Sequence, residues 1–74
     1  MTVTVYTKNN CVQCRMAKKF LTTQAVAFNE INVDDNPEHL ATLKAQGHRQ
    51  MPVVTAGDTT IAGFRPDLLA TLTA

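Results

Sequence analysis

The chain has 74 residues, of which 45% are hydrophobic and 18% are charged, and its formal net charge is +1. This composition predicts one small globular domain over residues 1–74 rather than a disordered chain. The sequence has neither a basic stripe nor clustered aromatic and arginine residues, so we expect no nucleic-acid partner. It shows no basic leader with a following apolar core, and no apolar run near the ~20 residues that span a bilayer. We therefore expect a cytoplasmic protein without a membrane partner.

The first half of the chain predicts a strand, a helix and a second strand. Residues 2–7 alternate β-branched and small polar side chains, which indicates a strand buried on both faces. Residues 8–10 favour a turn, and a helix is expected to begin near Cys11. Residues 26–33 form the second strand, which should lie parallel to the first through a right-handed crossover. The helix side chains expected to face the core are Val12, Met16, Ala17, Phe20 and Leu21.

The second half predicts a helix, a hairpin and a last helix. The Asn36-Pro37 pair is typical of a helix start, with Asn36 as N-cap, and precedes a helix over residues 38–46. Residues 50–55 and 59–62 flank a short turn and predict an antiparallel hairpin. A helix over residues 66–72 follows. The leucines expected to face the sheet are Leu40, Leu43, Leu68, Leu69 and Leu72.

Cys11 and Cys14 are the only cysteines of the chain. Cysteines three apart on the first turn of a helix bring their Cα atoms within the roughly 4.4–6.8 Å that a disulfide requires. The helix N-terminus favours negative charge, and Lys8 and Arg15 add positive charge nearby. Cys11 is therefore the candidate thiolate, with a pKa below the ordinary value of about 8.5, and Cys14 is the candidate resolving thiol.

Other uses of such a pair fit the sequence less well. A four-residue loop gains only about 2 kcal/mol as a structural crosslink in the chain-entropy model. A zinc site would need His39 and His48, whose separation is not that of closed structural sites, and we expect both to be solvated surface histidines. Thiolates also suit Cu(I), but small copper chaperones usually read Met-x-Cys-x-x-Cys, and Asn9 stands at the methionine position. Copper binding therefore remains an alternative, and we predict no metal ligands.

The order β-α-β-α-β-β-α, with Cys-x-x-Cys at the first strand-to-helix junction, defines an α/β fold. It resembles the thioredoxin fold in its minimal glutaredoxin form, with a four-stranded mixed sheet flanked by three helices, over essentially the whole chain. Met51-Pro52 resembles the peptide bond that is characteristically cis beside the dithiol in this superfamily. The resemblance implies that the backbone of Met51 is open to β-like pairing with a substrate polypeptide.

Two motifs direct the resemblance to one group within the superfamily. Cys11-Val12-Gln13-Cys14 resembles the dithiol of the NrdH-type redoxins, and differs from the Cys-Pro-Tyr-Cys of glutaredoxins and the Cys-Gly-Pro-Cys of thioredoxins. Gly63-Phe64-Arg65-Pro66-Asp67 is similar to the NrdH signature. That signature usually reads Trp-Ser-Gly-Phe-Arg-Pro, and Ile61-Ala62 replace its first two residues here. This departure concerns the docking surface more than the chemistry.

The resemblance implies an electron carrier that binds no cofactor of its own and works through the Cys11–Cys14 disulfide. NADPH would reduce it through flavin-containing thioredoxin reductase, and the large subunit of a class Ib ribonucleotide reductase would receive the electrons. A glutathione-dependent glutaredoxin is the alternative, although Gly63-Phe64 replaces the Gly-Gly-x-x-Asp pattern that resembles a glutathione site. We expect a monomer, because electron carriers make small transient contacts. The implied partner contacts are Val12, Gln13, Met51, Pro52, Gly63, Phe64 and Arg65, with Phe64 exposed for docking.

Overall fold

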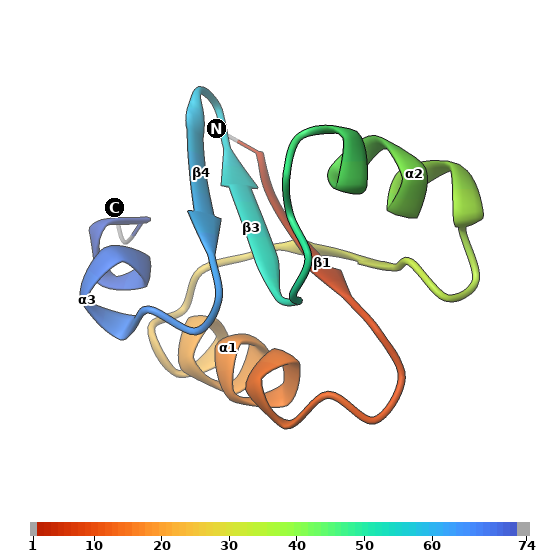
Figure 1. Cartoon of the computed structure of the whole chain (residues 1–74). Coiled ribbons are helices and arrows are strands. Elements are labelled where there is room, and N and C mark those ends of the chain that lie inside the picture. Colours follow the sequence, from red (N-terminus) through yellow and green to blue (C-terminus); the bar gives the residue numbers. More distant parts are fainter. Residues whose placement is uncertain (1, 73–74) are drawn as a thin grey trace.

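A computed structural model describes residues 2–72 and contains one mixed sheet with the strand order β2-β1-β3-β4 (Figure 1). The strands are β1 (Val3–Thr7), β2 (Asn29–Asn32), β3 (Val53–Ala56) and β4 (Thr59–Ala62). β1 is parallel to β2 and antiparallel to β3, and β3 pairs with β4 as an antiparallel hairpin. The predicted parallel crossover and the predicted hairpin are both confirmed.

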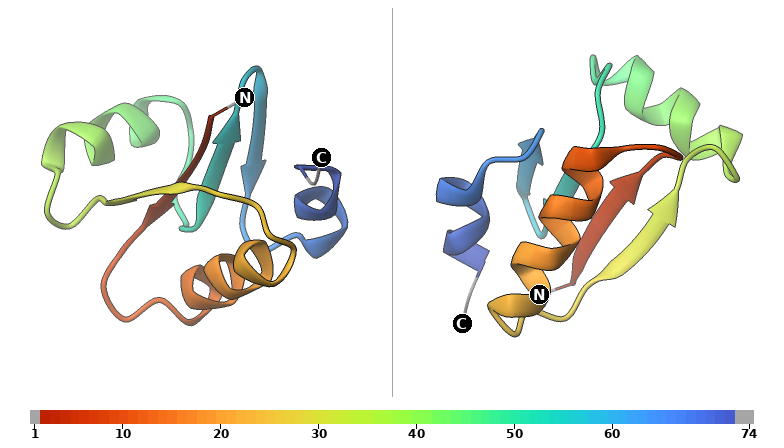
Figure 2. Two further views of the ribbon diagram at one scale, coloured as in Figure 1. Left: turned by 180° about the vertical axis from the view of Figure 1, so that it is seen from behind. Right: turned by 90° about the horizontal axis from the view of Figure 1, so that it is seen from below.

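Three helices cover the two faces of the sheet. They are α1 (Val12–Thr23), α2 (Pro37–Ala45) and α3 (Pro66–Leu69), and a 3₁₀ turn (Ala70–Leu72) follows α3. α1 and α3 lie on one face, and α2 lies on the other (Figure 2). This is the predicted thioredoxin-type arrangement. Across residues 2–72, none of the helices has the length and apolar character needed to cross a membrane.

The buried apolar side chains form two groups. The first, here called the large cluster, lies between the sheet and the α1/α3 layer and consists of Val3, Val5, Ala17, Leu21, Val54, Ala56, Ile61, Leu69 and Leu72. The second, here called the cysteine cluster, consists of Cys11, Cys14, Val33, Leu43, Met51 and Val53. Because successive side chains of a strand point to opposite faces, Val53 and Val54 of β3 belong to different clusters.

The predicted inward face of α1 is wrong in part. Val12 is 59% exposed and Met16 is 44% exposed, whereas Cys14, Ala17 and Leu21 are buried. Burying small side chains such as those of Cys14 and Ala17 lets the helix axis approach the sheet closely, and the larger Met16 then turns outward. Phe20 is only half-buried. The outer face of α1 is therefore partly apolar.

Three smaller predictions also need correction. Val26 does not begin β2, because its N–H bonds to the Leu21 carbonyl (2.9 Å) and closes the end of α1 with Ala25 at φ 59°. Leu68 is 39% exposed, since the change to a 3₁₀ turn aligns only Leu69 and Leu72 with the core. In β1 only alternate residues are fully buried, because α2 covers just part of the second face of the sheet.

Candidate active site

The Sγ atom of Cys11 caps the N-terminus of α1. β1 ends at Thr7, a short turn follows with Asn10 in the left-handed region (φ 56°), and Cys11 then adopts an extended conformation (φ −109°, ψ 106°). The backbone N–H of Cys14 donates to this sulfur at 3.1 Å. A helix N-terminus carries unpaired N–H groups and positive potential, so it stabilises negative charge on a capping atom. The local fold thus favours a thiolate at Cys11.

Cys11 and Cys14 are joined by a disulfide with a Cα–Cα distance of 5.2 Å. This distance lies within the range expected from their spacing on one helical turn. Cys11 is 8% exposed and Cys14 is 2% exposed. Because the sulfur of an incoming group needs a line of approach, the difference in exposure favours Cys11 as the cysteine that a partner reaches first.

The peptide bond between Met51 and Pro52 is cis, as predicted. The Met51 carbonyl oxygen lies 3.6 Å from Cys11 Sγ, so a thiol at this sulfur can donate to it. On the other side, the Pro52 carbonyl accepts a hydrogen bond from the Gly63 N–H at 2.8 Å. The loop before β3 therefore connects the dithiol to the segment that follows β4.

A shallow depression of about 310 Å³ opens beside the disulfide. It is lined by Lys8, Cys11, Val12, Gln13, Gln50 and Met51. The structure thus brings together the dithiol, the residues between its cysteines, the predicted charged neighbour Lys8 and the predicted backbone contact Met51. Gln50 was not among the predicted site residues. Its position directly before Met51 was the one available signal, because the two residues share the bend that leads into β3.

In the segment after β4, only the position of Phe64 differs from the prediction. Gly63 has φ 79°, a left-handed conformation that favours glycine. Arg65 is exposed and pairs with Asp67 at 3.2 Å, and this guanidinium lowers the pKa of the Asp67 carboxyl. Phe64 is half-buried and packs against the large cluster instead of standing free beside the disulfide.

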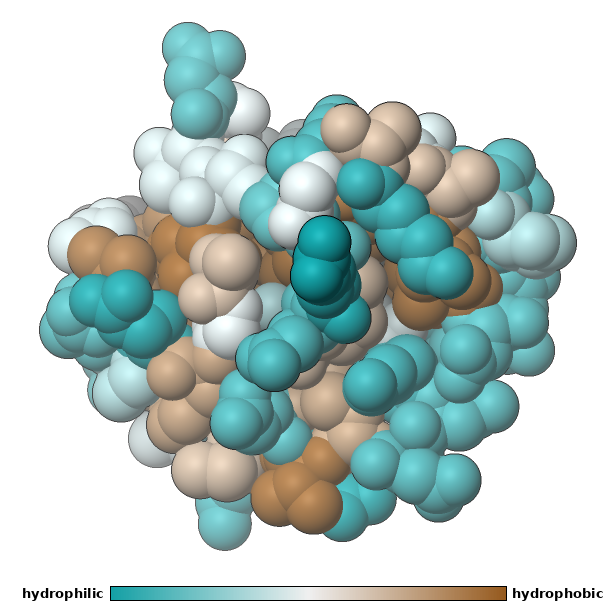
Figure 3. Space-filling model, viewed as in Figure 1, coloured by the Kyte–Doolittle hydropathy of each residue, from teal (hydrophilic) through white to brown (hydrophobic). Residues whose placement is uncertain are grey.

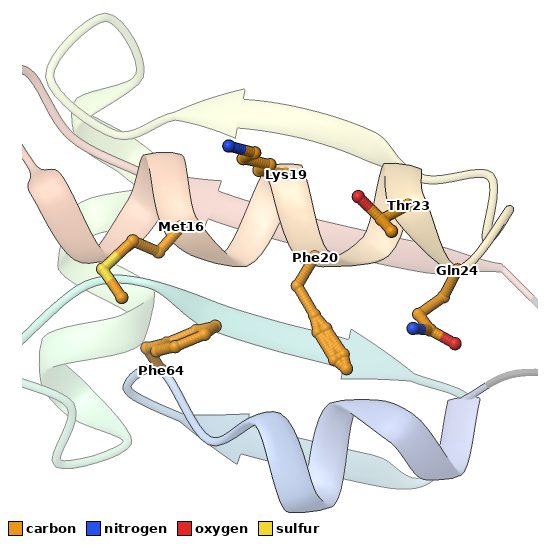
Figure 4. Close-up of a pocket in the computed structure, with 6 residues that line it drawn as sticks. All are labelled: Met16, Lys19, Phe20, Thr23, Gln24 and Phe64. Atoms are coloured by element: carbon orange, nitrogen blue, oxygen red, sulfur yellow. The ribbon is translucent and has the colours of Figure 1, made fainter.

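Phe64 lines a second hollow, here called the α1/α3 groove, which has a volume of about 490 Å³. Its ring meets the ring of Phe20 edge-on, with centroids 6.4 Å apart. Figure 4 shows Met16 and Phe20 extending from α1 on the side of the helix that faces Phe64. The groove has none of the dithiol residues in its lining, which consists of Met16, Lys19, Phe20, Thr23, Gln24 and Phe64.

The two histidines are less solvated than predicted. Both His39 and His48 are half-buried, and the His39 ring lies 5.9 Å from that of Tyr6, centroid to centroid. Among residues 2–72, no three His, Cys, Asp or Glu side chains gather in a way that could hold a metal ion. The described histidines therefore do not complete a three-ligand site with the cysteine pair.

Comparison with known proteins agrees with this geometry. The glutaredoxin family model matches residues 3–61. The chain belongs to the glutaredoxin family, a class of thiol-disulfide oxidoreductases, and Cys11–Cys14 is its redox-active pair.

The most informative relatives are glutaredoxin-like NrdH proteins. The one from Lactococcus lactis subsp. cremoris is 51% identical over 70 residues, which cover 95% of this chain and 97% of the relative. The solved structure of the NrdH-redoxin from Escherichia coli superposes with a TM-score of 0.95 at 49% identity, covering 97% and 95% of the two chains. A glutaredoxin from Neisseria meningitidis is 40% identical over 65 residues, covering 85% and 76%. Within its family, the chain is of the NrdH type.

Proposed function

We propose that the chain is a dithiol-disulfide electron carrier in which Cys11 attacks and Cys14 resolves. The Cys11 thiolate attacks one sulfur of a target disulfide, forms a mixed disulfide and releases the other target sulfur as a thiolate. The Cys14 thiol then loses its proton and attacks Cys11 Sγ, which closes the Cys11–Cys14 disulfide and releases the reduced target. The position of Cys11 Sγ at the N-cap of α1, within 3.1 Å of the Cys14 amide nitrogen, carries this assignment.

The loop before β3 supplies the contact that holds the target's backbone. Within residues 2–72 the N–H of Met51 donates no hydrogen bond, and its carbonyl is 3.6 Å from Cys11 Sγ. An extended segment beside Met51 can pair with both of these groups, as an added strand does at a sheet edge. Val12, Gln13 and Pro52 shape the same surface. This pairing would place a target sulfur against Cys11.

Thioredoxin reductase, itself reduced by NADPH, is the electron donor in this proposal. The E. coli relative at 49% identity is described as having a thioredoxin-like activity profile. The segment Gly63-Phe64 replaces the glycine pair of the glutathione-site pattern, which weakens the case for glutathione. The resemblance to NrdH redoxins supports the large subunit of a class Ib ribonucleotide reductase as the recipient. Gly63, Phe64 and Arg65 are the proposed contacts for these partners.

The decisive experiment measures NADPH consumption with a disulfide acceptor in two parallel assays. One contains the purified protein with thioredoxin reductase, and the other contains it with glutathione and glutathione reductase. Turnover in the first assay alone is the expected result, and reduction of the ribonucleotide reductase subunit is then measured directly. Turnover in the second assay alone would make the protein a glutathione-dependent glutaredoxin. No turnover in either assay would contradict the proposal, and stoichiometric Cu(I) binding would then identify a copper-binding module.

A further inference from the structure

The outer face of α1 carries an apolar stripe that leads away from the disulfide. Val12, Met16 and Phe20 recur every four residues and therefore lie on one side of the helix. Val12 lines the depression beside Cys11, whereas Met16 and Phe20 line the α1/α3 groove. In Figure 3, brown and tan atoms reach the surface along the lower edge of the molecule, where α1 lies. The stripe thus joins the reactive sulfur to the groove.

The groove is shaped to hold a large apolar side chain. Met16, Phe20 and Phe64 form its apolar part, and Phe64 is anchored because it packs against the large cluster (Figure 4). Exposed apolar surface next to a reactive group is typical of an interaction site. The 44% exposure of Met16 gives the surface some adaptability, since an unbranched thioether side chain can adjust to an incoming group.

The charged side chain in the groove lining is that of Lys19. α1 contains Arg15, Lys18 and Lys19 and no acidic residue. Lys18 pairs with Glu30 at 3.0 Å, whereas neither Arg15 nor Lys19 forms an ion pair with any residue in the range 2–72. Lys19 lies on the rim of the groove, with its ammonium group directed away from Phe64 in Figure 4. An acidic side chain beside the apolar one would therefore be favoured here.

Helix geometry sets the distance that an occupant must span. Val12 and Phe20 are eight positions apart, which corresponds to about 12 Å along the helix axis. An extended peptide advances about 3.3 Å per residue. A segment whose cysteine is at Cys11 therefore places the residue about four positions away over the groove.

We propose that the α1/α3 groove recognises an apolar side chain, flanked by an acidic one, that lies about four residues from the exchanging cysteine of the redox partner. This inference rests on the proposed function, because it assumes that Cys11 is the attacking sulfur. The occupant is an extended segment of the partner polypeptide. The groove then selects partners by sequence around their cysteines, in addition to the backbone pairing at Met51.

The test uses the Cys14→Ser variant and short peptides that each contain one cysteine as a disulfide with 5-thio-2-nitrobenzoate. The Cys11 thiolate attacks the peptide sulfur, a Cys11–peptide disulfide forms, and the coloured thionitrobenzoate leaves with the electron pair of the broken bond. Leucine is placed four residues before or after the cysteine with glutamate next to it, because a segment can cross α1 in either direction. The comparison peptides have the same composition with leucine adjacent to the cysteine.

In at least one direction, the peptide with distant leucine should react about tenfold faster than its composition-matched partner. Met16→Ser should remove most of this preference. The control is Leu68→Ser, which should retain the preference. Leu68 is 39% exposed, close to the 44% exposure of Met16, but it lies outside the groove lining. Lys19→Glu should make a peptide with lysine in place of glutamate the faster one. Equal rates for the two leucine positions in both directions would overturn the inference.

A small symmetrical disulfide, dithiobis(2-nitrobenzoate), separates this inference from the proposed function. If the Cys14→Ser variant does not react with it, Cys11 is not the attacking sulfur, and both proposals fail. If it reacts while the peptides show no preference, only the groove assignment fails. Light scattering of the intact chain tests whether a second copy of the chain occupies the groove instead. A dimer that Met16→Ser dissociates would assign the groove to this second copy and overturn the inference.

Discussion

The two apolar clusters of this molecule differ in what they contain. The large cluster is built from aliphatic side chains alone and lies between the sheet and two helices. The cysteine cluster includes both cysteines and Met51, and reaches the surface at the depression beside Cys11. Stability and chemistry are thus carried by different parts of one small core. Substitutions in the two clusters should accordingly have different consequences.

The largest effect is expected at the resolving cysteine. Cys14→Ser should lower turnover with protein disulfides by at least about a hundredfold, because the mixed disulfide at Cys11 cannot be released. Mass spectrometry should detect a trapped adduct between Cys11 and the target. Cys11→Ser is the control and should trap none; equal trapping by the two variants would reverse the proposed roles.

A matched pair of core truncations compares the clusters directly. Leu21 of α1 is fully buried in the large cluster, and Leu43 of α2 is 4% exposed in the cysteine cluster. Leu21→Ala should reduce the free energy of unfolding by about 3–5 kcal/mol, and Leu43→Ala by about 2–3 kcal/mol, since α2 covers only part of its face of the sheet. Urea denaturation measures both changes.

The same pair should rank in the opposite order for activity. Per folded molecule, Leu43→Ala should slow disulfide exchange more than Leu21→Ala, because Leu43 shares its cluster with both cysteines. The disulfide-exchange rates of the two variants are measured without urea and are divided by the fraction of folded protein. A greater loss of activity from Leu21→Ala would show that the two clusters are not functionally distinct.

Two of the three glycines at positive φ offer a smaller contrast. Gly63 (φ 79°) and Gly47 (φ 92°) both have open space where a Cβ would stand, so alanine adds backbone strain without a clash. Each substitution should cost about 1–2 kcal/mol of stability. Gly63→Ala should also lower turnover, because the Gly63 N–H bonds to Pro52 beside the dithiol, whereas Gly47→Ala should not. Equal turnover of the two variants would show that the hydrogen bond between Gly63 and Pro52 does not affect disulfide exchange.

The smallest effect concerns an ion pair at the edge of the sheet. Lys18, by its hydrogen bond and charge, and Thr7 lower the pKa of Glu30 from its ordinary 4.5, against the opposing effect of burial. A lowered pKa stabilises the folded state above the unfolded value, and this contribution is lost as the pH falls below 4.5 through the folded value. Because the pair is partly exposed, Glu30→Gln should cost under about 1 kcal/mol at pH 7. Thermal unfolding compares the stability of the unsubstituted chain with that of Glu30→Gln, and the difference found at pH 7 should disappear at pH 3. A stability difference that stays the same at both pH values would exclude the ionised carboxylate as its cause.

Local signals in the sequence were sufficient for much of the fold. The Asn36-Pro37 pair, the turn between β3 and β4, and the alternation within the strands each depend on neighbouring residues, and the element order was predicted correctly. The cis bond before Pro52 followed from the family resemblance, and the Cys11–Cys14 disulfide agrees with the spacing argument. The dithiol was predictable from the sequence because its two cysteines are only three positions apart.

The orientation of α1 could not be deduced in the same way. Hydrophobicity favoured Met16 and Phe20 as core residues, but the sheet accepts the smaller face of Cys14 and Ala17. That choice depends on the distance between helix and sheet, which only the tertiary structure sets. The position of Phe64 over the large cluster, and hence the α1/α3 groove, depends on the same contact between α1 and the segment before α3.

One atom serves as both helix cap and reactant, and this gives the protein an internal reporter. The Cys14 amide hydrogen points at Cys11 Sγ, so its protection from deuterium exchange depends on the charge of that sulfur. A thiolate accepts a stronger hydrogen bond than a disulfide sulfur does, because a charged acceptor strengthens the bond. Reduction should therefore slow deuterium uptake at this single amide. Exchange of that proton, measured by NMR, would report the redox state of the molecule without a dye or an attached probe.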